Sequence, residues 1–175
     1  MEVMIDIETL STRYNSVIVA IGAVKFNRKS SIKLNYTSKF FKTIDRESCV
    51  KLGMDIDEST LKWWSKQDSD VQKQILYGKD DIKNVLVELS EWFGDSKIVW
   101  SHGATFDIPI LCEAYKRCSM NPPWNFWNCR DTRTIYDLAG IVPVFENKHN
   151  SLDDCISQIN AVKKSMNLLS ERILK

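Results

Sequence analysis

The chain has few of the residues that hold disulfide-stabilised or zinc-stabilised proteins together. Only five of its 175 residues are cysteine and two are histidine. The number of cysteines is odd and no two of them form a C-x-x-C pair. We therefore expect neither a disulfide framework nor a structural zinc site, and we interpret the cysteines as reduced, mostly buried thiols.

Long apolar stretches are also missing. No apolar run approaches the roughly 20 residues that a membrane-spanning helix needs. The first residues, Met1–Asp6, contain no basic region followed by an apolar stretch and a cleavage site. We expect no membrane segment, no signal peptide and a cytoplasmic location. The length suits a single domain over residues 1–175.

An overall excess of basic charge is absent, because the formal net charge is only +1. Charge alone therefore does not point to nucleic acid. A local excess exists between residues 25 and 46, and it has two interpretations: a solvated hairpin surface, which we favour, or a rim that binds a phosphate backbone. Its members are Lys25, Arg28, Lys29, Lys33, Lys39, Lys42 and Arg46.

The hydrophobic periodicity predicts an α/β fold. Three strands come first, helices follow, and two strand–helix units and a final helix close the chain. The opening strands form antiparallel hairpins and the later ones add parallel strands. We expect strands at 2–7, 16–26, 33–41, 97–101 and 128–131, and helices beginning near 57–59 and spanning 82–93, 106–118, 132–139 and 153–168.

The first candidate motif is Asp6-Ile7-Glu8, on the first expected strand. Residues two apart on a strand face the same side, so both carboxylates point in one direction. Adjacent carboxylates repel each other unless a cation lies between them, and Mg²⁺ or Mn²⁺ is the natural cation for such hard oxygen ligands. Taken alone, an exposed acidic strand end is the simpler explanation of the triplet.

The second motif is Asp107, which begins a helix directly after an apolar strand. This edge of an α/β sheet is where ligands bind. The alternative is that Asp107 only complements the helix dipole.

The third motif combines His149 and Asp154 at the start of the last helix. Ser151 and Asp154 have the spacing of a capping box, which would explain Asp154 without any function. That explanation leaves His149 without a role. The pair can instead supply one metal ligand and one base, while Asp153 would point elsewhere.

Together the motifs give four carboxylates and one histidine, which is the set that two-metal hydrolysis needs. In their order and spacing they resemble the DnaQ-like (RNase-T-like) 3′→5′ exonucleases of the DEDDh branch. The segments 60–64, 100 and 129–134 are similar to an exonuclease VIII-like and RNase AS-like sub-branch that includes phage enzymes. The likeness extends from residue 2 to about residue 160.

The resemblance implies a ribonuclease-H-like fold with a central five-stranded mixed sheet flanked by helices. It implies that Asp6, Glu8, Asp107 and Asp154 hold two Mg²⁺ or Mn²⁺ ions and that His149 is the general base. The substrate would be the 3′ end of DNA or RNA, and the product a nucleoside 5′-monophosphate. A phage enzyme would act in the host cytoplasm. The resemblance also allows a homodimer. The expected substrate contacts are Ile7, Thr9, Leu10, Phe106, Trp63 and Arg130.

Several assignments have alternatives. Trp63 and Trp64 point in different directions on a helix, so one packs in the core and the other is free either for partial exposure or for base stacking. Arg130 and Arg133 either bind phosphate or brace the site. One alternative function is a catalytically silent nucleic-acid-binding module, which the five intact catalytic positions disfavour. Another is a polymerase-associated proofreading module, for which no docking motif is evident in the sequence.

Overall fold

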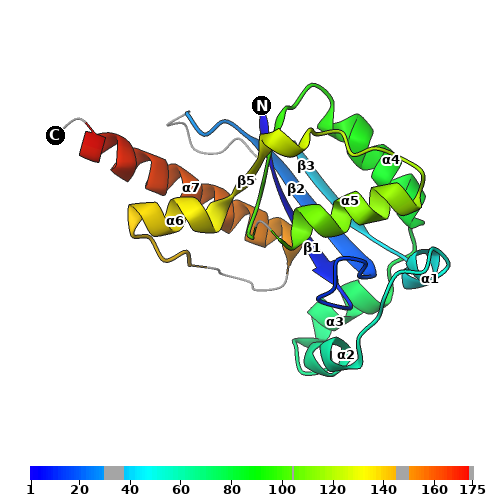
Figure 1. Cartoon of the computed structure of the whole chain (residues 1–175). Helices are drawn as coiled ribbons and strands as arrows, with labels where there is room; N and C mark the ends of the chain where they lie inside the picture. Colours follow the sequence, from blue (N-terminus) through cyan, green and yellow to red (C-terminus); the bar gives the residue numbers. More distant parts are fainter. Residues whose placement is uncertain (30–37, 104, 145–149, 174–175) are drawn as a thin grey trace.

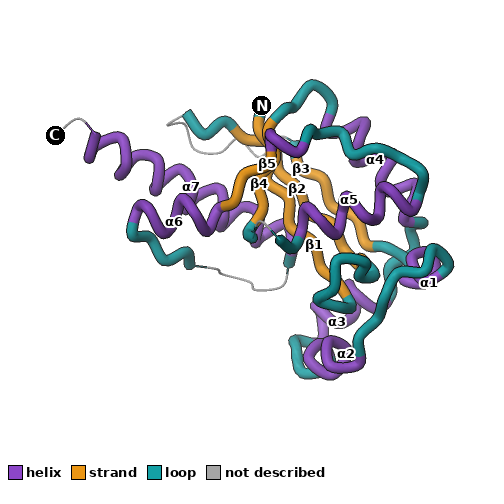
Figure 2. Tube along the Cα trace, in the orientation of Figure 1, coloured by secondary structure: helices purple, strands orange, loops and turns teal. Residues whose placement is uncertain are grey.

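The computed structural model describes residues 1–29, 38–103, 105–144 and 150–173. A five-stranded sheet lies at its centre, in the order β3-β2-β1-β4-β5 (Figures 1 and 2). The first two pairings, β1–β2 and β2–β3, are antiparallel, and β1–β4 and β4–β5 are parallel. The predicted mixed sheet is confirmed. Its strands are β1 (Glu2–Thr9), β2 (Ile18–Phe26), β3 (Lys39–Thr43), β4 (Ile98–Ser101) and β5 (Cys129–Asp131).

The helices begin at capping residues that the sequence makes recognisable. Asp57 and Asp81 each accept a backbone N–H of the first turn, and Gly140 ends its helix with a φ of +70°. The helices are α1 (Arg46–Val50), α2 (Glu58–Trp64), α3 (Ser69–Leu76), α4 (Ile82–Phe93), α5 (Asp107–Arg117), α6 (Thr132–Ala139) and α7 (Ser151–Ile173), with a 3₁₀ turn at Phe126–Asn128.

The sheet separates two apolar cores. On one face Val3, Ile5 and Ile7 of β1 pack into a large core with α4 and α5. On the other face Met4 joins a smaller core with α6 and α7. Figure 1 shows α6 and α7 together on one side of the sheet and α4 and α5 on the other. Because side chains alternate along a strand, the residues that follow Met4 at spacing two, Asp6 and Glu8, lie on the α7 face.

Four features differ from the expected elements. The third strand, expected at 33–41, is β3 at Lys39–Thr43, and residues 30–37 lie outside the described residues. Two short helices, α1 and α3, were not predicted. The last helix extends well beyond the expected 153–168.

No helix in the described parts of the chain is long and apolar enough to cross a membrane.

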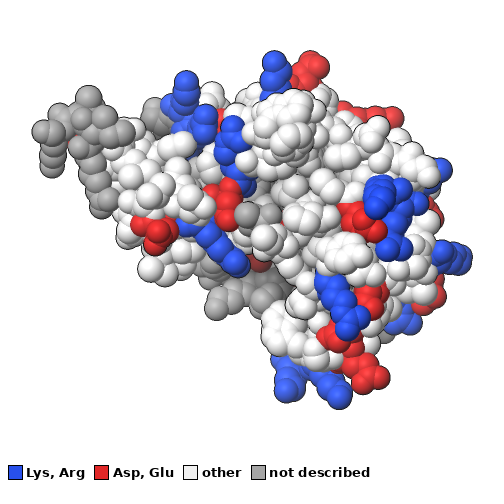
Figure 3. Space-filling model, in the orientation of Figure 1, with Lys and Arg blue, Asp and Glu red and all other residues white. Residues whose placement is uncertain are grey.

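Several members of the basic segment between residues 25 and 46 pair with acids, while Lys33 lies outside the described residues. Arg28 pairs with Glu2, and the amine of Lys42 lies 2.6 Å from Glu88. Lys25 stacks on the ring of Trp92. On the face in Figure 3, basic and acidic side chains are interspersed, without a broad area of one sign. These contacts favour the solvated-hairpin interpretation of the segment.

Candidate active site

Three carboxylates come together where the carboxyl end of β1 lies next to the start of α7. One oxygen from each of Asp6, Glu8 and Asp154 lies within 4.8 Å of the other two. Asp153 is not part of this group, as its spacing predicts. The simpler explanation of the Asp6–Glu8 pair, an exposed strand end, is wrong, because Glu8 is only 8% exposed.

The capping explanation of Asp154 is also wrong in its detail. The side-chain oxygen of Asn150 accepts the backbone N–H groups of Leu152 and Asp153, so Asn150 is the capping residue and Ser151 is already helical. The hydroxyl of Ser151 is buried without a hydrogen-bond partner among the described residues. Asp154 therefore lies one turn into α7 and is directed towards Asp6 and Glu8.

Asp107 approaches the same site from the first turn of α5. Its carboxylate accepts the backbone N–H of Ile7 at 3.2 Å, and the side chain is only 3% exposed. This bond ties the start of α5 to the middle of the acidic strand. Asp107 therefore does more than complement the helix dipole, because it shares the carboxylate environment of Asp6 and Glu8.

Burial raises the pKa of three of these carboxylates, Asp6, Glu8 and Asp107. Burial is the largest cause, and it raises the pKa of Glu8 to about 8, with Asp154 and Asp107 adding to the shift. Burial raises the pKa of Asp107 to about 7, although the Ile7 N–H opposes the shift. The pKa of Asp6 is raised well above its ordinary value by burial and then by Asp107, Glu8 and Asp154.

This donor set fits divalent cations. Glu8 Oε1 is buried and accepts no hydrogen bond within the described part of the chain, so it has a lone pair to offer. Clustered buried carboxylates are costly unless protons or cations neutralise them. All-oxygen donors suit Mg²⁺ and Mn²⁺.

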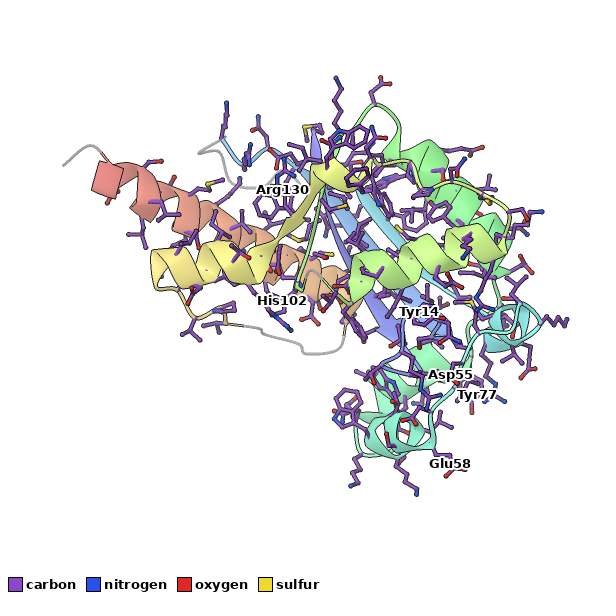
Figure 4. The ribbon with its side chains drawn as sticks, viewed as in Figure 1. Tyr14, Asp55, Glu58, Tyr77, His102 and Arg130 are labelled. Atoms are coloured by element: carbon purple, nitrogen blue, oxygen red, sulfur yellow. The ribbon has the colours of Figure 1, made fainter. Side chains whose placement is uncertain are left out.

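The two histidines of the chain differ in what the structure shows. His149, the predicted base, lies outside the described residues. His102 follows β4 and is labelled in Figure 4. Its Nδ1 lies 2.8 Å from Thr132 Oγ1, and burial, followed by the charge of Arg133, lowers its pKa.

A pocket of about 470 Å³ opens beside Glu8. Four of the predicted substrate contacts line it: Ile7, Thr9, Trp63 and Phe106. Trp64 lies deeper, with its indole N–H donating to the Thr9 carbonyl at 2.8 Å, and it is only 5% exposed while Trp63 is 43% exposed. The prediction that one tryptophan packs and its neighbour stays open is confirmed. The pocket's remaining walls come from Thr12, Ser59 and Thr60.

Leu10 and Arg130, also predicted as substrate contacts, lie elsewhere. Leu10 is fully buried in the larger core, so contact with a nucleotide would require the segment after β1 to move. The guanidinium of Arg130 donates to the carbonyls of Trp127 and Cys129 and braces the start of β5 (Figure 4). Arg133 is the arginine near the acids, because its charge acts on both Asp107 and His102.

The profile of the 3′-5′ exoribonuclease Rv2179c-like domain matches residues 1–166. The chain belongs to this family. The matched range includes all four carboxylates and the whole pocket lining. The expectation of a 3′→5′ exonuclease is thereby confirmed, whereas the exonuclease VIII-like or RNase AS-like branch stays a prediction.

One curated protein and one solved structure are similar to this chain. The exodeoxyribonuclease of Enterobacteria phage T4 is 21% identical over 203 residues, covering 93% of this chain and 88% of that protein. The S. pombe Pop2p structure, in its Mg²⁺- and Mn²⁺-bound form, aligns with a TM-score of 0.56 at 11% identity, covering 93% of this chain and 81% of the other. The latter likeness shows a shared ribonuclease-H-like fold, as expected.

The structure adds one buried residue to this family site that the sequence did not single out. Gln158 lies one turn after Asp154 on α7, and its amide donates to Asp6 Oδ1 at 2.8 Å. The i, i+4 spacing from Asp154 is the signal that could have indicated it, because residues four apart share a helix face.

Proposed function

We propose that residues 1–175 form one metal-dependent exonuclease domain that removes nucleotides from the 3′ end of a nucleic acid strand. The observation that carries the proposal is the buried group formed by Asp6, Glu8 and Asp154, with Asp107 beside it and an open pocket alongside. A catalytically silent module would have little reason to maintain so unfavourable a cluster of acids.

The four carboxylates would hold two Mg²⁺ or Mn²⁺ ions. When bound, the ions supply charge stabilisation to the scissile phosphate and the leaving oxygen. Glu8 would contribute Oε1, which has no hydrogen-bond partner among the described residues. One oxygen of Asp107 accepts the Ile7 N–H, and the other would bind a cation. The anionic substrate needs these cations, since four unscreened carboxylates would repel it.

The pocket beside Glu8 would orient the terminal nucleotide. Trp63 and Phe106 present aromatic surface on which a base can stack, which contributes about 1–3 kcal/mol per base. Thr9 lies at the end of β1, next to the carboxylates, so a nucleotide in the pocket has its phosphate near the acids. Arg133 is placed to meet a phosphate on the Asp107 side.

His149 would act as the general base. It would take a proton from a water molecule whose oxygen bonds to the terminal phosphorus. The bond from phosphorus to the 3′ oxygen of the preceding nucleotide breaks, and that oxygen takes up a proton from solvent. The products are a nucleoside 5′-monophosphate and a strand with a new 3′ hydroxyl. The motif supports this role, since His149 directly precedes Asn150, the capping residue of the helix that carries Asp154.

We propose RNA as the preferred substrate, because the matching family is described as exoribonucleases. The T4 relative is described as an exodeoxyribonuclease, so DNA is the competing substrate.

The test uses 5′-labelled single strands of RNA and DNA with one sequence, each with a free or a blocked 3′ end. We expect one-nucleotide shortening of the free RNA strand in Mg²⁺ or Mn²⁺ and none in excess chelator. Asp154→Ala protein, purified in parallel, should be inactive, and Asp153→Ala serves as the matched active control. Cleavage of a circular strand, or activity in chelator, would contradict the proposal. Faster DNA digestion would reverse the substrate preference alone.

A further inference from the structure

The three clustered acids of the site come from two parts of the chain that are far apart in the sequence. Asp6 and Glu8 belong to β1, near the start of the chain, and Asp154 belongs to α7. The distance between these two groups therefore depends on how α7 packs on the sheet. Contacts between α7 and the strands β1 and β2 are what fix it.

The first such contact is made possible by Gly22. This residue pairs with Asp6 in the β1–β2 register and faces α7. A Cβ at this position would lie 2.5 Å from the backbone carbon of Ser151 and 2.7 Å from the backbone nitrogen of Leu152. Backbone atoms at the start of a helix cannot rotate away as a side chain can. The start of α7 therefore rests directly on the bare backbone of β2.

The second contact follows one turn along α7. The thiol of Cys155 lies 3.4 Å from the Gly22 carbonyl and 3.6 Å from the Met4 carbonyl. Cys155 is fully buried, so the close packing of α7 on β1 and β2 continues along the helix. A small side chain is needed here for the same reason that glycine is needed in β2.

The third contact reaches the acids themselves. Gln158 is 1% exposed, and its amide N–H donates to Asp6 Oδ1 at 2.8 Å. The backbone carbonyl of Gln158 accepts the hydroxyl of Tyr136 from α6, which fixes this turn of the helix from behind. An amide never ionises, so it orients the Asp6 carboxylate without adding a fifth negative charge.

We infer that Gly22 and Gln158 are positioning residues of the metal site: Gly22 sets how close Asp154 comes to the strand acids, and Gln158 sets the direction of the Asp6 carboxylate. The inference rests on the proposed function, since it concerns the same carboxylates. Neither residue lines the pocket beside Glu8. Both act through ligands, as groups that hold metal-binding side chains in place commonly do.

The experiment compares matched pairs of variants by Mn²⁺ calorimetry, melting temperature in chelator and steady-state kinetics. Gly22→Ala is paired with Gly78→Ala, whose Cβ would clash with the backbone of Ile44, far along the chain from the acids. Both should lose stability through a backbone clash. Only Gly22→Ala should bind Mn²⁺ about tenfold or more weakly and lose about 10²-fold in kcat, with a smaller change in KM.

Gln158→Met is paired with Ser165→Ala. Ser165 is also a fully buried polar residue of α7, but its hydroxyl bonds only within the helix, to the Ala161 carbonyl. We expect about 10–100-fold weaker Mn²⁺ binding for Gln158→Met and wild-type Mn²⁺ binding for Ser165→Ala. If Gly22→Ala does not fold, this second pair decides the inference.

Folded Gly22→Ala and Gln158→Met proteins with wild-type Mn²⁺ affinity and kcat would overturn the inference. So would an equal loss of Mn²⁺ affinity in both members of each pair, since that would show a general effect of lost stability. A wild-type protein that binds Mn²⁺ but degrades neither RNA nor DNA would overturn the proposed function instead. The Mn²⁺ affinities of the variants would then still decide the positioning roles.

Discussion

The two faces of β1 carry opposite kinds of side chain within one strand. On the α5 face, Val3, Ile5 and Ile7 are all buried in the larger core. On the α7 face, the buried Met4 is followed by Asp6 and Glu8, so the apolar core gives way to acids within two residues. One face therefore stabilises the fold, while the other gives up stability to place together the acids that we propose as cation ligands. Four predictions test this division.

The largest effect is expected for Glu8→Gln. The substitution removes a proposed metal ligand but keeps the shape of the side chain. We expect at least about 10³-fold loss of activity. We also expect a higher melting temperature in chelator, because the amide is neutral at every pH, whereas the Glu8 carboxyl is ionised in the unfolded chain at neutral pH and must take up a proton when it is buried beside Asp154 and Asp107. Activity assays and thermal melts of the same preparation measure both. A melting temperature that falls in chelator would contradict the division between the faces.

The opposite outcome is expected for Ile5→Ala on the other face. Ile5 is fully buried in the larger core, so truncation leaves a cavity and should lower the free energy of unfolding by about 2–5 kcal/mol. Well below the lowered melting temperature, kcat in Mg²⁺ should stay near that of the wild type. Urea titrations give the stability. A strong loss of kcat in fully folded protein would show that the two faces are not independent.

The third prediction concerns pH. The folded protein holds protons on Glu8 up to about pH 8 and on Asp107 up to about pH 7, whereas the unfolded chain releases them near their ordinary pKa values of 4.5 and 3.8. Between these limits the folded state binds more protons, so stability falls as pH rises. Melting temperatures in chelator should decrease from about pH 5.5 to 8.5, and saturating Mg²⁺ should flatten the decrease. A flat or rising curve in chelator would contradict the assignment.

The smallest effect is expected for the two arginines. Arg133→Ala should raise KM by roughly tenfold, about 1.4 kcal/mol, because a charged contact with phosphate is lost. Arg130→Ala is the matched control, and it should leave KM unchanged and lower stability slightly, since Arg130 holds backbone carbonyls near β5. Kinetics at two salt concentrations measure the difference. The reverse pattern would assign the phosphate contact to Arg130.

The sequence predicted the sheet and the acidic motifs because both depend on short-range periodicity. The alternation in β1 indicated that Asp6 and Glu8 share a face, and the cap and glycine signals located α4 and α6 well. The short helices α1 and α3 lack a long apolar repeat and were missed.

Contacts between distant segments could not be predicted from the sequence. The hydrogen bond from Gln158 to Asp6 joins residues 152 positions apart. The close approach of Gly22 to the start of α7 is of the same kind. Leu10 illustrates the converse, since a motif position suggested contact with substrate and the surrounding core buries it.

The central position of β1 in the sheet has a consequence for the rates at which the amide hydrogens around the site exchange with solvent. Strands pair with residues 2–4 of β1 on both sides, so the amide hydrogens of this part of the strand should exchange with solvent only when the whole sheet unfolds. The start of α7 is held to the sheet by packing and by the Cys155 contact rather than by strand pairing, so we expect it to detach in smaller fluctuations. A cation held between Asp6 and Asp154 would then link a slowly exchanging strand to a faster-exchanging helix and would disfavour detachment of that helix. Cation binding should accordingly slow hydrogen exchange at the start of α7 far more than in β1.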